Sequence, residues 1–205
     1  MRIFLIIIGI FITCLSTNAQ KTFGIKAGLG TSIILIKDNS EINDIDFVEN
    51  QHFGFVKKFP LKYNCDLLID LLWSKKGGKL FFHDNFATIN LNYISLPIYV
   101  NYNIQKFSLG IGLEPSFKIR TVVQGVSANE VQKALFERTF SQNFNTNLFT
   151  SQSFIWKNIY LENRIGVGLQ PLTKYNCTDE NGNTLIQENT GTSIWLQFSL
   201  GYFFK

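Results

Sequence analysis

The chain lacks the features that most directly indicate a membrane-spanning helix, a nucleic-acid-binding surface or a metal site. It contains no run of about eighteen consecutive apolar residues, the length that indicates a transmembrane helix. Its formal charge is only +4 and no basic run exceeds two residues, so no nucleic-acid partner is expected. Its two histidines, His52 and His83, have no metal-site spacing, so no metal and no cofactor are expected.

Signatures of catalysis are also missing. No G-x-S-x-G segment is present for a serine nucleophile. The glycine pairs in "GLG" (28–30) and "GIG" (110–112) are not followed by the helix that a phosphate-binding loop needs. Glu114 and Glu162 could be imagined as paired acids, but their strand context favours ion-paired structural residues. We therefore expect no enzymatic activity.

The first segment, "MRIFLIIIGIFITCLSTNAQ", has the organisation of a secretory signal peptide. We expect residues 1–19 to be cleaved before Gln20, leaving about 185 residues (20–205) as one domain. An uncleaved anchor is disfavoured because the apolar core is shorter than the ~20 residues of a spanning helix. A lipoprotein is disfavoured because the residues before Cys14 form a poor lipobox.

The rest of the chain is dominated by two-residue alternation, which predicts β-strands. In "FSLGIGLEPSFKIR" (107–120), the odd-numbered residues are apolar, while Ser, Gly, Glu, Lys and Arg occupy the even positions. An irregularity near Tyr93 suggests a β-bulge. The eight predicted strands lie near residues 23–30, 52–61, 65–76, 89–104, 107–120, 144–156, 159–170 and 194–204.

The predicted connections alternate between short and long, which is typical of an outer-membrane β-barrel. We expect a short helix in the third long loop, because Ser127 and Glu130 form a capping box beside Val126 and Val131. The segment "ENGN" (180–183) indicates a turn in the last loop. The short connections are 62–64, 105–106 and 157–158, and the long ones are 32–50, 77–88, 121–143 and 173–192.

The polar face of each strand combines glycine with charges of both signs. Glycine weakens a surface strand, whereas inside a narrow barrel it leaves room for long side chains that can pair. We therefore expect a charged network in the barrel lumen and apolar faces turned to lipid, the reverse of a lipocalin-like soluble binder. The predicted lumen residues are Lys26, Asp70, Glu114, Lys118, Arg120, Glu162 and Arg164.

Since lipid leaves no backbone group unpaired, the sheet must close, and the last strand must pair with the first. The predicted fold is therefore all-β: an eight-stranded antiparallel up-and-down transmembrane β-barrel with a short helix in the third long loop. Tyr202 and Phe204 would lie at the membrane boundary.

Several segments together resemble the PorT-like family of small outer-membrane β-barrels of Bacteroidota. They are the leader end "NAQ", "FGIKAGLG", "LLWSKKGGK", "LNYISLPIYVNY", "SLGIGLEPSFKI", "IYLENRIGVGL" and the terminal "FSLGYFFK". The stretch "YISLPI" is the most specific, although family members often carry an acid where Ser95 stands and often end on Phe. The resemblance implies an outer-membrane barrel. One branch of the family is linked to type IX secretion and gliding, but no shared motif carries that role onto this chain.

The expected function is that of a structural or interaction component of the cell envelope. The alternatives are a barrel that binds or transports a small ligand through its long loops, and a soluble exported binder. Expected partners are outer-membrane lipid and envelope proteins, and the barrel is expected to be a monomer. Cys65 and Cys177 should lie at opposite ends of a band about 25 Å tall, beyond the roughly 7 Å that a disulfide spans, and therefore remain free thiols.

Overall fold

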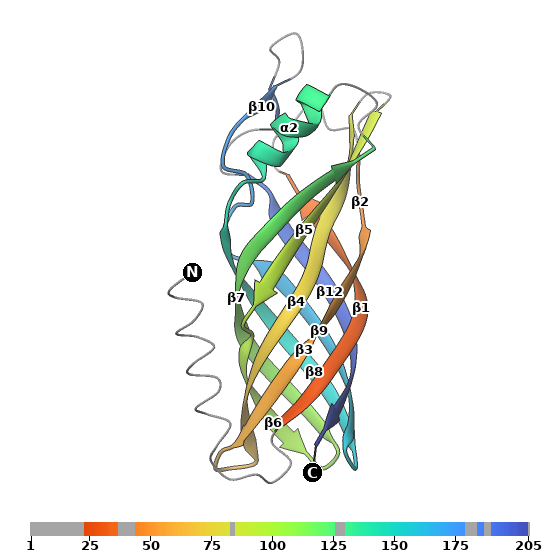
Figure 1. Ribbon diagram of the computed structural model, residues 1–205. Helices are drawn as coiled ribbons and strands as arrows, with labels where there is room; N and C mark the ends of the chain where they lie inside the picture. Colours follow the sequence, from red (N-terminus) through yellow and green to blue (C-terminus); the bar gives the residue numbers. More distant parts are fainter. Residues whose placement is uncertain are drawn as a thin grey trace.

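The protein is built almost entirely of antiparallel strands (Figure 1). The computed structural model describes residues 23–36, 44–82, 85–125, 130–178, 184–186 and 190–204, so the predicted signal peptide and Ser127 lie outside the described residues. The long strands are β1 (Phe23–Leu35), β3 (Val48–Pro60), β4 (Cys65–Phe82), β5 (Asn85–Ser95), β6 (Ile98–Ile104), β7 (Phe107–Gln124), β8 (Phe144–Trp156), β9 (Ile159–Gly168) and β12 (Thr192–Phe203). The shorter elements are β2 (Asp44–Asp46), helix α2 (Glu130–Thr139), β10 (Cys177–Thr178) and β11 (Thr184–Ile186).

The sheet closes on itself into a barrel. The final strand β12 pairs antiparallel with β1, from Gly24 opposite Phe203 to Leu35 opposite Thr192. Around the ring the order is β1, β3, β4, then β5 and β6 sharing one position, then β7, β8, β9 and β12, which makes eight positions. The predicted eight-stranded up-and-down barrel and its closing strand pair are confirmed. Among the described residues, no helix has the length and apolarity needed to cross a membrane.

A β-bulge lies beside Tyr93, but it is on the neighbouring strand β7 and not within the segment 89–104, where the sequence suggested it. The register between β5 and β7 shifts between Asn92 and Tyr93, so that Asn92 pairs with Arg120 and Tyr93 pairs with Lys118. The extra residue is therefore Ile119 of β7. A bulge of one residue reverses which face the following side chains occupy, because strand side chains alternate.

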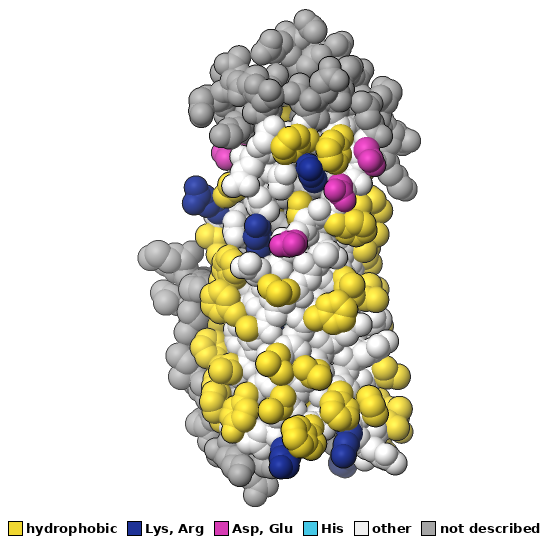
Figure 2. All heavy atoms as spheres, turned by 90° about the vertical axis from the view of Figure 1, so that its right-hand side faces the viewer, with side chains coloured by type: hydrophobic (Ala, Val, Ile, Leu, Met, Phe, Trp, Pro, Cys, Tyr) yellow, Lys and Arg dark blue, Asp and Glu magenta, His cyan; other side chains and the backbone are white. Residues whose placement is uncertain are grey.

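The outer surface of the barrel is apolar and the inner surface of its lower half is polar. Leu29 and Phe107 are 65% and 62% exposed, whereas Lys26 on the inner face of β1 is 3% exposed. Figure 2 shows hydrophobic side chains over the middle and lower part of one face, with charged side chains above them and at the lower edge. This distribution is the reverse of that of a water-soluble protein.

Aromatic side chains of the first and last strands contact one another at the end of the barrel where Figure 1 places the C-terminal residues. Tyr202 and Phe204 are 42% and 41% exposed and contact each other edge to face, with ring centroids 5.7 Å apart. Phe204 also stacks on Phe23 of β1 at 5.8 Å. Aromatic girdles of this kind mark the membrane interface in barrels. The strand β12 therefore both closes the barrel and anchors its lower edge.

The upper interior is apolar and is closed by α2, which lies across the opposite end of the barrel (Figure 1). Phe136 of α2 is 2% exposed and Phe140, just after it, is 1% exposed. Inward residues of β5 that face this cluster are Ile89 and Leu91, whereas Ser95, lower on the same strand, faces a polar region. The predicted helix is present. The residues of the apolar cluster are Ile34, Leu80, Ala87, Ile89, Leu91, Tyr93, Val123, Phe136, Phe140, Leu172 and Ile186.

The prediction of a long loop at 77–88 is wrong. The β4 and β5 strands remain paired through this region up to the Phe82–Asn85 pair, so the segment is a tall hairpin. The predicted strand ends before Gly77, but Gly77 and Gly78 both lie within β4. A Cβ on Gly78 would lie 2.7 Å from the backbone nitrogen of Ile34, so glycine here permits β1 and β4 to approach closely across the interior.

Candidate functional site: the charged barrel interior

Four charged side chains meet in the lower half of the barrel. Lys26 Nζ lies 2.5 Å from Asp70 Oδ2 and 2.8 Å from Glu162 Oε2. Arg164 Nη2 lies 2.6 Å from the same Asp70 oxygen and 3.0 Å from Glu162 Oε1. The four groups come from β1, β4 and β9, and all four side chains are almost completely buried. Two cations and two anions cancel, as burial of charge requires.

Aromatic side chains surround this four-charge cluster. The Tyr99 hydroxyl donates a hydrogen bond of 3.0 Å to Glu162 Oε1. The Arg164 guanidinium lies over the rings of Tyr99 and Phe149, 4.4 and 4.8 Å from their centroids. Cation–π contacts gain strength when the cation is desolvated. The cluster is therefore held by a hydrogen bond and by cation–π contacts as well as by its ion pairs, and it connects several strands across the barrel interior.

A second ion pair lies above the first cluster. Lys76 Nζ lies 2.5 Å from Glu114 Oε1 and 4.2 Å from the centroid of the Trp195 ring. The Ser116 hydroxyl donates to the same Glu114 oxygen at 3.2 Å and also contacts the Ser95 hydroxyl at 2.9 Å. This pair is likewise neutral overall, so the two ion-paired groups together add no net charge to the polar part of the lumen.

Inward-facing glycines make room for these large side chains. A Cβ on Gly166 would collide with the Trp195 ring, and one on Gly201 would collide with the Tyr160 ring. Glycine on the polar faces thus has the spatial role that the sequence pattern suggested, because each lies beneath a bulky side chain of an adjacent strand.

The structure places the predicted lumen residues in three groups. Lys26, Asp70, Glu114, Glu162 and Arg164 lie in the interior and form the ion pairs described above. The other two predicted members, which both follow Glu114 on β7, lie elsewhere.

Lys118 is half-buried and donates a hydrogen bond to the carbonyl oxygen of Phe140, after α2. Arg120 is exposed on the outer surface, so its predicted place in the lumen is wrong. The cause is the bulge at Ile119, which turns Arg120 outward although it has the same parity as Glu114.

The sequence alone did not identify three residues that make contacts in the barrel interior. Lys76 shares the parity of Asp70 on β4, which could have identified it, but the double lysine left its orientation open. Trp195 sits on the mixed face of the last strand and serves as a platform for Lys76. His52 lies 2.7 Å from the Ser199 hydroxyl, a cross-strand contact that no local pattern reveals.

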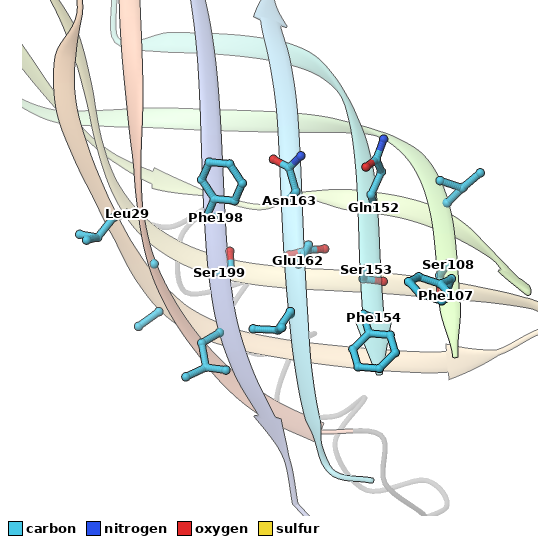
Figure 3. Close-up of a pocket in the computed structure, with 15 residues that line it drawn as sticks. Leu29, Phe107, Ser108, Gln152, Ser153, Phe154, Glu162, Asn163, Phe198 and Ser199 are labelled. Carbon is cyan, nitrogen blue, oxygen red and sulfur yellow. The ribbon is translucent and has the colours of Figure 1, made fainter. Parts of the chain in front are cut away.

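Within the part of the chain that the structure describes, no group of three or more His, Cys, Asp or Glu side chains could hold a metal ion. Two hollows, of about 650 and 600 Å³, are lined by outward apolar side chains such as Leu29 and Phe53. Figure 3 shows the first of them, on the outer face of β1, β12, β9, β8 and β7.

Cys65 is a free thiol at the first residue of β4, beside a short turn. Its sulfur lies 3.6 Å from the carbonyl oxygen of Tyr63. Cys177 begins β10, at the other end of the barrel (Figure 1). The two residues therefore lie at opposite ends of the barrel, which is the placement from which free thiols were predicted.

A closed antiparallel barrel with an apolar outside and a compensated charged inside defines a transmembrane barrel of the outer membrane. The family model described as "Outer membrane protein beta-barrel domain" matches residues 18–176, which is more than half of the chain. The protein belongs to this family, and its location is the cell outer membrane.

Three solved structures that are similar to this chain are of bacterial surface or outer-membrane proteins. Neisserial surface protein A matches with a TM-score of 0.50 and 11% identity, covering 89% of this chain and 97% of that one. OprG of Pseudomonas aeruginosa matches with a TM-score of 0.41 and 11% identity, over 89% and 95% of the two chains. Ail of Yersinia pestis gives 0.41 and 10%, over 90% and 100%. At such identities the similarity to the neisserial protein shows the fold alone. No curated protein matches the chain.

Proposed function

We propose that this protein is a non-conducting structural or interaction component of the outer membrane, which meets a protein partner through its loop end. The observation that carries this proposal is the filled interior. The lower half contains neutral ion-pair clusters, and the upper half contains an apolar cluster that α2 covers. An eight-stranded barrel is just wide enough for side chains to fill it. A continuous aqueous path for ions or solutes is not expected.

The loop end has the composition of a contact surface. The Arg138 guanidinium of α2 lies 5.1 Å from the centroid of the Tyr175 ring, and Lys174 Nζ lies 5.5 Å from the same ring. Tyr175 is 40% exposed, and Phe47 beside β2 is 59% exposed. Tyrosine, phenylalanine and arginine are enriched in protein interfaces. The Lys174 amide donates to the Thr139 carbonyl at 2.8 Å, which ties this surface to α2.

We further propose membership of the PorT-like group within the wider family, and a link to secretion or surface assembly that rests on that membership and on no motif of its own. The support is the "YISLPI" segment, which in the fold is the break between β5 and β6. Asp70 N donates to the Pro97 carbonyl and Leu96 N to the Pro115 carbonyl, each at 2.9 Å. The segment thus connects directly to Asp70, a member of the four-charge cluster. Because the segment has this structural role, its presence supports a common origin with the PorT-like group. The biological partner is to be identified by experiment.

Planar-bilayer recording tests the non-conducting state. The purified barrel should give no conductance steps above the baseline of protein-free bilayers. Steady single-channel currents from the wild-type protein would refute the proposal and favour the alternative, a barrel that transports small ligands.

Cross-linking on intact cells tests the interaction surface. Arg138→Glu combined with Tyr175→Ala should abolish a cross-linked protein adduct that the wild type forms. Lys106→Glu, in a short turn at the opposite end, is the matched control and should leave the adduct unchanged. Equal adducts in both variants, or no protein adduct at all, would refute a role for this surface.

A further inference from the structure

Two amide side chains lie side by side on the lipid-facing surface. Gln152 of β8 and Asn163 of β9 are direct cross-strand partners. Gln152 is exposed and Asn163 is half-buried. Figure 3 shows both side chains at the outer hollow, pointing in the same direction, with Phe198 and Phe154 nearby. This pair of amides interrupts a surface that is otherwise apolar on the neighbouring strands.

The amide pair lies well inside the apolar band. Gln152 is four residues from Trp156, and Asn163 is four residues from Ile159, where the strands end at the short turn. Strands rise about 3.3 Å per residue and tilt by roughly 40°, so the amides lie about 10 Å above the strand ends. The apolar band of such barrels is about 25 Å tall. Outward residues on both sides of the pair are mostly apolar: Phe154 and Leu161 lie below and Leu148 and Ile165 above, with the exposed Thr150 between Gln152 and Leu148.

Lipid chains cannot form hydrogen bonds with these amides. Among the described residues, Asn163 Oδ1 has no hydrogen-bond partner, but this oxygen is buried against its own chain, so the exposed Gln152 side chain is the amide that faces the lipid most directly. An amide that is left unpaired in an apolar medium is unfavourable. Leucine or isoleucine would fill these positions without this cost. The exposed part of the amide pair is therefore stabilised by a partner that supplies donors and acceptors within the membrane.

We propose that this face of β8 and β9 binds a second copy of the chain, forming a two-fold symmetric dimer. A carboxamide carries both a donor and an acceptor, so two identical amide pairs related by a two-fold axis satisfy each other. A two-fold interface requires this self-complementarity, since the same patch lies on both sides. The adjacent hollow, about 650 Å³ and lined by Leu29, Phe107, Phe154 and Phe198, would receive protruding side chains of the second copy. The proposed dimer differs from the monomer expected from the sequence.

Cysteine cross-linking in membranes tests the location of the interface. All three native cysteines, Cys14, Cys65 and Cys177, are first changed to alanine. Asn163→Cys should then form a dimer with a short bis-thiol reagent. Ile69→Cys is the matched control: it is half-buried, faces outward and lies four residues from the start of β4, four strands away around the barrel. Equal cross-linking at the two positions, or none at Asn163→Cys, would overturn the proposal.

Self-association in micelles tests the role of the amides. The double variant Gln152→Leu/Asn163→Leu should raise the dimer dissociation constant about tenfold, the effect expected from losing a few hydrogen bonds inside a membrane. The variant should still fold, because lipid accepts leucine, and heat-modifiable migration on gels verifies this. An unchanged dissociation constant, a monomeric wild type, or Asn163→Cys adducts that contain only another protein or lipid would each refute a dimer at this face.

Discussion

The buried ion pair between Lys76 and Glu114 allows a quantitative test of charge compensation in the lumen. Glu114→Leu removes the carboxylate that lies 2.5 Å from Lys76 Nζ. The ammonium group then remains inside the barrel, where both side chains are at most 4% exposed. The same substitution removes the acceptor of the Ser116 hydroxyl, although Ser116 keeps its 2.9 Å contact with Ser95.

The expected loss of stability follows from the unpaired lysine. Removing one partner of a buried ion pair costs about 3–5 kcal/mol. The Trp195 ring, 4.2 Å from Lys76 Nζ, continues to stabilise the cation, so we expect a value at the lower end, about 3 kcal/mol. Replacing both partners, as Lys76→Met with Glu114→Leu, should restore the unfolding free energy to within about 1 kcal/mol of the wild type.

Urea unfolding of the barrel in lipid vesicles, followed by tryptophan fluorescence, measures these differences. The double variant is the internal control for changes in packing volume. The reasoning would be refuted if Glu114→Leu alone stayed within about 1 kcal/mol of the wild type. It would also be refuted if the double variant were as unstable as the single one, because charge would then not be the cause.

Three further predictions concern orientation. Leu113→Arg places a charge on the lipid-facing side of β7 and should destabilise by about 2–4 kcal/mol in the same unfolding assay; a change below about 1 kcal/mol would contradict its outward position. Arg120→Glu should change stability by no more than about 0.5 kcal/mol, because the side chain is exposed, whereas Arg164→Met should cost about 3–5 kcal/mol. An impermeant thiol reagent on intact cells should label Cys177 and spare Cys65, and mass spectrometry that found the opposite pattern would invert the topology.

Local sequence pattern was sufficient to predict most of the fold. Side chains alternate across a strand, so one segment such as 107–120 already separates a lipid face from a lumen face. The physics of lipid then requires closure, and the last strand must pair with the first. The positions of Lys26 and Glu162 on the inner face also followed from alternation alone, because no bulge intervenes on β1 or β9 in the described register.

The side-chain orientations and partners that depend on strand register could be determined only from the tertiary structure. A single extra residue at Ile119 moved Arg120 from the inside to the outside, and the sequence pattern showed only that some irregularity was near. The partners of Lys76 also required the structure, since Glu114 and Trp195 reach it from distant strands. The same holds for Gln152 and Asn163, eleven positions apart in the chain yet direct neighbours across β8 and β9. Alternation determines the face of each side chain, but neighbours across a barrel are set by strand stagger, which arises only when all strands close together.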